Sequence, residues 1–544
     1  KSGKYIILFN GEFYNHKLFR VKLEADGFIF TGSSDTEVIL EAIEYYGLDF
    51  LEKVEGMYSM ILFDKENSFL YLINDRFGEK PLYYYYDDKT IFFSSDIKSF
   101  KFKKRKLNIK AISNYFNNYV INYPDTIWDK VTRIEPSQIL KFKLDFIKEK
   151  VSLINNKKYW INNKNIKVFS KDSLQKNADN LENLLFSVIE RQLDNDTITG
   201  CFLSGGIDST LVSVIASKLN KNLTTLSIGF SDNNLDESKY AIKIGEYLKT
   251  DHHNKIFSPD DVSHIFNEIP IVYGEPFADS SQLPTMLLCK FASTKVKVAL
   301  TGDGGDELFG GYDRYSFVPK FWKYLRFTPK NSRILLKKFF EKLSPHSYTL
   351  TKFFIQKILL KYKNTNFLEI KLRNLILSLD SSNPTEFAKK LSFHFFDEFG
   401  LVLKDSNFKK EFNYDSEISI MRNIMLNDID DYLPNDLLVK VDRAAMHYGL
   451  ETRIPFLNHN IFEFSQSLPD YYKNKDGKSK IILKEILKRY LPENLFDRPK
   501  HGFLAPLKDV MLSQQESINK LLNLEKINHQ NIIDSKLVGT ELNN

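Results

Sequence analysis

Short apolar runs separated by turn residues dominate the first 160 positions of the chain. These runs are YIILF (5–9), SMILF (59–63), FLYLIN (69–74), PLYYYY (81–86) and TIFFSS (90–95). Runs of this length that are rich in β-branched and aromatic residues predict strands. Between positions 36 and 46 apolar residues instead repeat at helical spacing, at Val38, Ile39, Ala42 and Ile43. We therefore predict a β-rich first region with a few helices.

The pattern changes at about Leu174, where predicted helices and strands begin to alternate. Helical periodicity covers 178–193, 209–220 and 236–250, with Asp236 as the expected N-cap of the third helix. Strand-like runs cover 197–203, 223–230 and 295–301. Helices and strands that alternate in this way predict right-handed crossovers and a doubly wound parallel sheet. Ligands of such sheets bind beyond the carboxyl ends of the strands.

These patterns predict an α/β protein with two domains. We place the first domain at 1–160, a polar linker at 161–173, the second domain at 174–520 and a C-terminal tail at 521–544. Between about Ser316 and Asn427 the chain is mainly helical and basic, as in TKFFIQKILLKYK. A membrane-surface role is one interpretation. The favoured interpretation is that these helices pack one face on a core and expose their lysines to water.

Composition narrows the classes of function. The 544 residues are 42% hydrophobic and 27% charged, and the formal net charge is only +6. Neither nucleic acid nor a membrane is therefore an expected partner. Cys201 and Cys289, the two cysteines, support neither a disulfide framework nor a Cys-based zinc site, and we expect a cytoplasmic protein. The sequence begins without methionine, so we expect that its true start is missing.

The segment CFLSGGIDSTLVSV (201–214) carries the first chemical motif. A predicted strand ends at Leu203, and a helix begins near Asp208 and Ser209 after the turn Ser204-Gly205-Gly206. Glycines let backbone N–H groups approach an anion, and a helix N-terminus adds N–H donors and positive potential. Asp208 fits beside a phosphate if Mg²⁺ lies between them. We interpret the segment as a phosphate cradle; a tight turn of small residues is the structural alternative.

A second motif, TGDGGDELFGGYDRY (301–315), follows another strand of the same predicted sheet. Asp303, Asp306 and Glu307 repel one another, so the loop is expected to hold a cation, either Mg²⁺ or the ammonium group of an amino acid. A nucleotide-splitting reaction also needs positive groups on the departing phosphates. Lys480 is the favoured candidate, because it directly precedes the apolar face of a predicted helix.

Together these residues resemble the glutamine-hydrolysing asparagine synthetase family. The resemblance rests on SGGIDS (204–209), SIGF (227–230), TGDGGDELFGGY (301–312), VDRAAM (441–446), LETRIPFL (450–457) and RPKHGF (498–503), which occur in this order. In the first region, FNGE (9–12), SDTEVI (34–39) and DRFGEKPLYY (75–84) are similar to class II glutamine amidotransferase domains. The resemblance implies an N-terminal-nucleophile α+β sandwich, incomplete here, followed by an ATP pyrophosphatase domain with helical additions.

The resemblance also implies a reaction. Ammonia from glutamine passes through an internal channel and attacks an aspartate adenylated by ATP, which yields asparagine, AMP, pyrophosphate and glutamate. Mg²⁺ is the implied cofactor. The small-molecule partners are aspartate, ATP and either glutamine or ammonia, and a homodimer stays an open expectation.

The family roles can be assigned to individual residues. ATP-binding residues would be Leu203 and Ile228 at the adenosine, Thr301 and Gly302 at the pocket wall, and Ser204, Gly205, Gly206, Asp208 and Ser209 at the pyrophosphate. Asp208 and Asp306 would hold metal, while Lys480, Asp303 and Asp306 would serve the adenylation step. Glutamine-binding residues would be Asn10, Gly11, Glu12 and Asp35, with Asn10 and Gly11 as oxyanion donors.

Some positions depart from the family pattern. Asp303 stands where relatives often have Glu, and Asn458 stands where Asp is usual. Neither cysteine fits the N-terminal nucleophile of the family. Asn10-Gly11 is also a common hairpin turn.

Alternative functions therefore stay open. One is a related adenylating amidotransferase that acts on another carboxylate or a cell-surface sugar precursor. Others are a β-lactam-synthetase-like enzyme and a non-catalytic binding protein.

Overall fold

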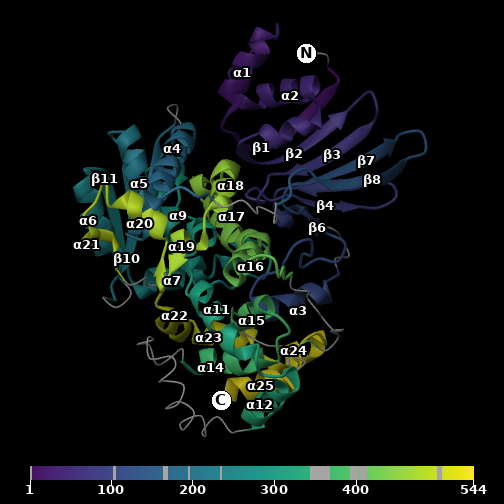
Figure 1. Ribbon diagram of the computed structural model, residues 1–544. Coiled ribbons are helices and arrows are strands. Elements are labelled where there is room, and N and C mark those ends of the chain that lie inside the picture. The colour runs from purple at the N-terminus through teal and green to yellow at the C-terminus, as the bar shows by residue number, and fades with distance from the viewer. Residues whose placement is uncertain are drawn as a thin grey trace.

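The computed structural model describes residues 3–101, 106–162, 170–193, 197–232, 236–342, 368–392, 402, 413–498 and 505–543. It is a mixed α/β structure with both antiparallel and parallel sheets, as the sequence predicts at this coarse level. In Figure 1 the antiparallel strands lie at the upper right and the parallel sheet lies at the left.

Two antiparallel sheets form the first part of the chain. The larger has the order β1-β2-β3-β7-β8, and the smaller has the order β5-β4-β6. Leu72 and Phe142 of the larger sheet share a core with Leu82 and Ile134 beside the smaller one. The strands are β1 (Tyr5–Phe13), β2 (Gly56–Asp64), β3 (Phe69–Asn74), β4 (Tyr83–Tyr86), β5 (Ile91–Ser94), β6 (Thr132–Arg133), β7 (Gln138–Asp145) and β8 (Lys150–Lys158).

Helices α1 (His16–Ala25) and α2 (Asp35–Tyr46) cover the opposite face of the larger sheet. Side chains of successive strand residues point to opposite faces, which is why Leu72 joins the inter-sheet core while Ile73 packs in the helix-covered core. Ser34 caps α2 by accepting a hydrogen bond from the Glu37 backbone N–H. The helix predicted at 36–46 is therefore confirmed.

The hairpin-turn interpretation of Asn10-Gly11 is wrong. Strand β1 continues to Phe13, and Asn10 and Gly11 pair with Ser59 and Tyr58 of β2. Gly11 has φ +148°, and a Cβ at this position would lie 2.6 Å from the Tyr58 Cα atom. Glycine is required here because the two strands approach closely and not because the chain turns.

The parallel sheet has the order β11-β10-β9-β12-β13, and every neighbouring pair is parallel. Its strands are β9 (Thr199–Phe202), β10 (Thr224–Phe230), β11 (Asp251–Phe257), β12 (Val298–Leu300) and β13 (Glu451–Arg453). From β9 the chain adds β10 and β11 on one side and then adds β12 and β13 on the other. The order therefore reverses between β9 and β12, where α/β sheets bind ligands.

Helices cover both faces of this sheet, as the doubly wound prediction requires. Cys201 and Leu300 pack in one core with α4 (Leu174–Gln192), α5 (Ile207–Leu219) and α20 (Ile481–Leu487). Phe202 and Ala299, one residue away on each strand, pack in a second core with α7 (Pro259–Phe266), α9 (Gln282–Ala292) and α17 (Leu438–His447). Adjacent strand residues in different cores identify two covered faces.

The N-cap predicted at Asp236 is wrong by one position. Helix α6 spans Ser238–Leu248, and Glu237 occupies the cap position without a side-chain capping bond. The Asp236 carboxylate accepts a hydrogen bond from the Ser238 backbone N–H instead. Asp236 therefore orders the turn that precedes the helix and does not cap it.

The predicted helical stretch from Ser316 to Asn427 is confirmed where it is described. It contains α11 (Arg314–Leu325), α12 (Lys330–Lys342), α14 (Leu368–Leu377), α15 (Pro384–Ser392) and α16 (Ile420–Asn427). The segment TKFFIQKILLKYK and most of the predicted linker lie outside the described residues. None of the helices in the described parts has the length and apolar character that crossing a membrane requires.

The C-terminal half adds a π-helical segment, η6 (Asp428–Leu437), which runs directly into α17. The remaining elements of this part are α8 (Ile269–Tyr273), α10 (Gly305–Phe309), α18 (His459–Ser467), α19 (Asp470–Lys473), β14 (Asn474–Lys475), β15 (Lys478–Ser479), α21 (Glu493–Phe496), α22 (Leu507–Ser513), α23 (Gln515–Leu521), α24 (Leu524–Gln530) and α25 (Ser535–Asn543). Helices α24 and α25 lie near the C-terminus at the bottom of Figure 1.

Candidate active site

The two motif loops meet at the point where the strand order of the parallel sheet reverses. Ser204–Ser209 follows β9, and Thr301–Asp306 follows β12, which is hydrogen-bonded to β9. Gly302 makes this approach feasible, because a Cβ there would lie 2.6 Å from the backbone nitrogen of Ser209. The fold therefore places both sequence-predicted loops in one site.

The turn after β9 is organised by two serine hydroxyls. The Ser209 hydroxyl accepts a hydrogen bond from the Ser204 backbone N–H (3.2 Å) and lies 2.9 Å from the Ser204 hydroxyl. Helix α5 begins directly after Gly206, so its free N–H groups face the same turn. Leu203 is 1% exposed and Ile228 is 7% exposed. The turn thus combines N–H and hydroxyl donors with apolar neighbours, as an anion-binding loop does.

The acidic loop is held by short-range hydrogen bonds. The backbone N–H of Thr301 donates to the Arg453 carbonyl of β13 (2.9 Å), and its hydroxyl donates to Asp303 Oδ2 (2.8 Å). Burial raises the pKa of Asp303, against the opposing effect of Lys440. The Glu307 carboxylate accepts a hydrogen bond from the Tyr312 hydroxyl, and burial together with Asp306 raises the pKa of Glu307 to about 7.

Lys480 joins the two loops. Its ammonium group forms ion pairs with Asp208 of α5 and with Asp306 of α10, the latter at 2.6 Å. Burial alone would lower the pKa of Lys480, but the two carboxylates outweigh burial and raise it. Lys480 is 4% exposed and has a left-handed backbone (φ 54°) at the start of α20. Ile482, Leu483 and Ile486 anchor that helix in the core and so fix the position of the ammonium group.

Arg498 is the first residue of the motif RPKHGF, to which the sequence analysis assigns no function. Its guanidinium stacks on the Tyr240 ring, 4.0 Å from the centroid, and forms an ion pair with Glu237 (3.0 Å). It also donates to the Ser204 carbonyl at 3.5 Å. Arg498 therefore lies against the cradle, while residues 499–503 of the same motif lie outside the described residues.

Other lysine and arginine side chains of the same part of the chain are distributed differently. Lys440 is buried, and its ammonium group donates to the Ser281 hydroxyl at 2.8 Å. Arg443 points to the antiparallel region, where it donates to the Tyr83 hydroxyl and to the Ser95 carbonyl. Lys484 pairs with Asp497 at 2.7 Å, outside the site. Arg443 and Lys484 therefore do not contribute to the site at the motif loops.

The predicted glutamine-binding residues also lie together. Asn10, Gly11 and Glu12 belong to β1, and the Asp35 carboxylate accepts a hydrogen bond (2.9 Å) from the backbone N–H of Phe13, next to Glu12. Oε1 of Glu12 lies 3.6 Å from Nη2 of Arg453, a residue of β13. A salt bridge thus connects this cluster to the parallel sheet.

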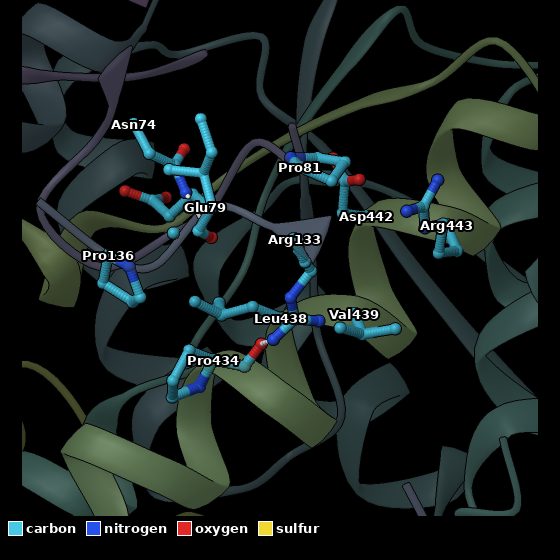
Figure 2. A pocket seen from close by; sticks show the side chains of 12 residues that line it. Asn74, Glu79, Pro81, Arg133, Pro136, Pro434, Leu438, Val439, Asp442 and Arg443 are labelled. Carbon is cyan, nitrogen blue, oxygen red and sulfur yellow. Dashed lines mark hydrogen bonds between the residues drawn. The ribbon is translucent and has the colours of Figure 1, made fainter. Parts of the chain in front are cut away.

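A small pocket lies between the two parts of the molecule and is lined by residues of both. Figure 2 shows Asn74, Glu79 and Pro136 on one side and Pro434 and Leu438 on the other. A second small pocket also has Glu79 in its wall, beside Tyr14 and His459. The two pockets therefore share a carboxylate on this boundary.

The loop that carries Glu79 is folded around one carboxylate. Asp75 accepts hydrogen bonds from the backbone N–H groups of Tyr58, Phe77, Glu79 and Lys80. This arrangement directs Lys80 across the boundary, where it pairs with Asp442 of α17 at 3.1 Å. Both partners are buried, so the loop and the helix are electrostatically joined away from water.

The two cysteines lie far from the glutamine cluster in the fold. Cys201 is in β9 and Cys289 is in α9, and each is buried in a core of the parallel sheet. Burial raises the pKa of the Cys201 thiol to about 12. Neither has the exposed, low-pKa character of a nucleophilic cysteine.

Two known protein families match the chain, and together they cover most of it. A sequence profile of asparagine synthase matches residues 180–544, and a profile of the glutamine amidotransferase domain matches residues 1–160. The chain belongs to the asparagine synthase family. Family membership associates it with ligase chemistry, asparagine biosynthesis and ATP binding, and the resemblance drawn from the motifs is confirmed.

Curated relatives in the asparagine synthase family cover most of the chain. Asparagine synthetase [glutamine-hydrolyzing] 1 of Bacillus subtilis (strain 168) is 29% identical, over 93% of this chain and 76% of that protein. Asparagine synthetase [glutamine-hydrolyzing] 3 of the same organism is 26% identical, over 92% of this chain and 76% of that protein. The solved structure of an allosteric regulatory enzyme of purine biosynthesis is 12% identical in sequence and has a TM-score of 0.22. The match covers 47% of this chain and 61% of the chain of that enzyme.

Proposed function

We propose that this chain synthesises asparagine from aspartate, ATP and ammonia. The aspartate side-chain carboxylate attacks the α-phosphorus of ATP, which forms a β-aspartyl-adenylate and releases pyrophosphate. Ammonia then attacks the acyl carbon, and AMP leaves as asparagine forms. The observation that carries the proposal is the placement of Lys480 between Asp208 and Asp306, where the two motif loops meet.

The cradle supplies the phosphate half of this reaction. The N–H groups and hydroxyls of Ser204–Ser209 would hold the departing pyrophosphate, and Lys480 would stabilise the charge that develops on it. Leu203 and Ile228 would contact the adenosine, with Thr301 and Gly302 at the pocket wall. Asp303 belongs to the same loop as Thr301, whose hydroxyl donates to it, and would help to position the reacting groups.

Asp208 and Asp306 fit a Mg²⁺ site of the kind that nucleotides complete. No group of three or more His, Cys, Asp or Glu side chains suited to a metal occurs in the described parts of the chain. Mg²⁺ usually takes one or two protein carboxylates and binds phosphate oxygens besides, so two carboxylates suffice. When bound, the ion would neutralise phosphate charge, while Lys480 keeps Asp208 and Asp306 close together.

We further propose that residues 1–160 form an amidotransferase domain of the N-terminal-nucleophile type. Residues 174–520 would form the ATP pyrophosphatase domain, joined by the linker 161–173 and followed by the tail 521–544. Asn10, Gly11, Glu12 and Asp35 would bind glutamine. The pockets that share Glu79 support an ammonia route across the boundary between the two parts (Figure 2).

Product analysis tests this proposal. The purified chain is incubated with aspartate, ATP, Mg²⁺ and ammonium chloride, and the nucleotide products are separated. We expect AMP, pyrophosphate and asparagine in equal amounts. Release of ADP instead of AMP would contradict the proposal, and so would adenylation of a different carboxylate while aspartate stays unchanged. Ammonium is the donor in this assay because neither cysteine is a candidate nucleophile.

A further inference from the structure

A two-stranded hairpin leads the chain into Lys480. Strand β14 pairs with β15 in the antiparallel sense, which places Asn474 opposite Ser479, the residue directly before Lys480. The turn residues Asp476 and Gly477 have φ values of 54° and 83°, as in the type I′ turn that joins two adjacent strands. The position of Asn474 is therefore coupled to that of the backbone that enters Lys480.

The side chain of Asn474 is hydrogen-bonded at both ends. Its Nδ2 donates to the Gly310 carbonyl (3.0 Å), and its Oδ1 accepts from the Ser316 hydroxyl (2.6 Å). Because a carbonyl only accepts, the amide nitrogen must face Gly310, which fixes the orientation of the side chain. Gly310 is the C-cap of α10, the helix that contains Asp306, and Ser316 belongs to α11. One amide thus connects the hairpin to both helices.

We infer that Asn474 is a positioning residue for Lys480, and that Ser316 holds Asn474 in the orientation this role requires. Asn474 acts by keeping the hairpin against α10, so that the Lys480 ammonium group reaches Asp306 and Asp208 together. The inference rests on the proposed function, in which Lys480 stabilises the charge that develops on the departing pyrophosphate. It adds a residue that acts on the reaction through Lys480.

The first argument is that both members of the Lys480–Asp306 ion pair are attached to this amide. Lys480 follows the strand partner of Asn474, and Asp306 belongs to the short helix whose C-cap carbonyl accepts from Asn474. The space between them is also tightly filled, since a Cβ at Gly311 would overlap the Lys480 Cε atom and the Asp306 carboxylate. A displacement of the hairpin relative to α10 would therefore alter the ion pair directly.

The second argument concerns the backbone of Lys480. Its φ of 54° is left-handed, a conformation that is unfavourable for residues with a Cβ and that persists only where the surrounding structure holds it. On the C-terminal side, buried Ile482 and Leu483 hold α20 in the core. On the N-terminal side, the hairpin is held through Asn474. Loss of the Asn474 side chain should therefore release one side of Lys480 and leave α20 folded.

The third argument is the exposure of the hairpin. Lys475 and Lys478 pair with each other in register and are exposed to solvent. Asn474 and Ser479 at the base are half-buried, and Lys480 beyond them is buried. The hairpin therefore meets the rest of the protein at its base, where the Asn474 side chain bonds to α10 and α11.

Steady-state kinetics test this role. We expect Asn474→Ala to lower kcat for pyrophosphate release about tenfold, the effect of a misplaced catalytic group, while the KM for ATP changes less than about twofold. Asn474→Asp keeps the size but loses the donor to Gly310, and it should lower kcat at least as much. Lys475→Ala is the matched control on the same strand and should leave kcat unchanged. A raised KM with unchanged kcat in Asn474→Ala would overturn the inference.

Ser316 provides a milder test, which also serves if Asn474→Ala does not fold. Ser316→Ala removes the hydroxyl that donates to Asn474 and should lower kcat by about threefold to tenfold, the usual effect of losing one hydrogen bond. Ser316→Thr keeps a hydroxyl and should restore kcat to within about twofold of wild type. Equal kcat for Ser316→Ala and wild type would show that Ser316 does not hold Asn474 for catalysis.

A double-mutant cycle separates positioning of Lys480 from general support of the fold. In a Lys480→Met background, Asn474→Ala should lower kcat by less than about twofold, because the group that Asn474 positions is absent. A residue that only stabilises the protein would show its full effect in either background. An undiminished tenfold loss in Lys480→Met would therefore contradict the inference.

Amine labelling tests the same inference without reference to catalysis. The protein is treated briefly with acetic anhydride, and labelled lysines are quantified by peptide mass spectrometry. Lys480 is 4% exposed, so we expect slow labelling in the wild type and labelling at least about threefold faster in Asn474→Ala. Lys475 and Lys478 are exposed internal standards whose rates should stay unchanged. Equal labelling of Lys480 in the two proteins would overturn the inference.

The two assays also distinguish this inference from the proposed function. If the wild-type protein releases AMP and the double-mutant cycle is additive, the positioning role is wrong while the reaction stands. If no carboxylate yields AMP in the wild type, the proposed function fails, and labelling of Lys480 still reports whether Asn474 holds it in place.

Discussion

Nζ of Lys480 lies 2.6 Å from Oδ1 of Asp306, with Lys480 at the start of α20 and Asp306 in α10, the short helix that follows β12. The same ammonium group also pairs with Asp208. One buried cation therefore holds two carboxylates that would otherwise repel each other at the junction of the motif loops.

Replacement of this cation should affect the chemical step. We expect Lys480→Met to reduce kcat for pyrophosphate release by about 10²- to 10³-fold, the usual loss when a preorganised electrostatic group is removed. Lys480→Arg keeps the charge and should retain more activity than Lys480→Met. Thermal unfolding of each variant checks that the fold is retained. A folded Lys480→Met protein with kcat within threefold of wild type would rule out this role.

Arg498 should contribute to binding of the phosphates. Its guanidinium lies against Tyr240 and near the Ser204 carbonyl, so Arg498→Ala removes a positive charge from the cradle. We expect the KM for ATP to rise about tenfold, with weaker product inhibition by pyrophosphate, as befits loss of a charge-assisted contact.

Tyr240→Phe is the matched control for Arg498→Ala, because it keeps the aromatic face and should leave both constants unchanged. If Arg498→Ala alters neither constant, Arg498 serves only to pair with Glu237.

The ion pair between Lys80 and Asp442 should join the two parts of the molecule. Both side chains are buried, so Lys80→Met leaves a carboxylate without its partner in a dry environment. We expect a loss of about 3–5 kcal/mol in the free energy of unfolding, measured with urea.

The double variant Lys80→Met with Asp442→Leu should recover much of this loss, because both charges are then absent. The surface pair of Lys520 and Glu516 is a control, and its removal should cost less than about 1 kcal/mol. A loss below 1 kcal/mol for Lys80→Met would contradict a stabilising role for the buried pair.

Glu307 should make stability depend on pH. Its pKa in the folded protein is raised from 4.5 to about 7, so the folded state binds the proton more tightly than the unfolded state. The stabilising effect is complete below about pH 4.5 and is lost as pH rises through about 7. Relative to Glu307→Gln, the wild-type protein should lose about 2–3 kcal/mol of unfolding free energy between pH 5 and pH 8.

Urea unfolding of both proteins at the two pH values measures this difference. Other titrating groups contribute equally to the wild-type protein and to Glu307→Gln, so their contributions cancel in the difference. A difference that stays constant with pH would show that Glu307 does not change its protonation in this range.

The amino-acid sequence alone determined the features that depend on neighbouring residues. The cradle is one continuous strand–turn–helix segment, so Ser204 and Ser209 meet wherever that segment folds locally. The helix at 36–46 follows from the spacing of its apolar residues. The parallel-sheet strand β10 is buried along almost its whole length, and its sequence TTLSIGF accordingly contains no charged residue.

Other features lay beyond the reach of sequence patterns. In the edge strand β11 every residue before Phe257 is exposed or half-buried, so its sequence DHHNKIF shows no hydrophobic run. Strand β13 has three residues and is defined by pairing with β12. Asn10-Gly11 has the composition of a turn, yet pairing with β2 keeps it extended.

Only the tertiary structure decided which charged groups meet. Lys480 and Asp208 stand 272 positions apart, and the apolar helix face that follows Lys480 marks it as a candidate without identifying its partners. Its left-handed backbone and the burial of α20 bring its ammonium group to the two loops. Asp279, just before α9, and Lys440 of α17 likewise meet at 3.6 Å because α9 packs against α17. Sequence patterns report which residues are buried, whereas the pairing of distant charges depends on how whole elements pack.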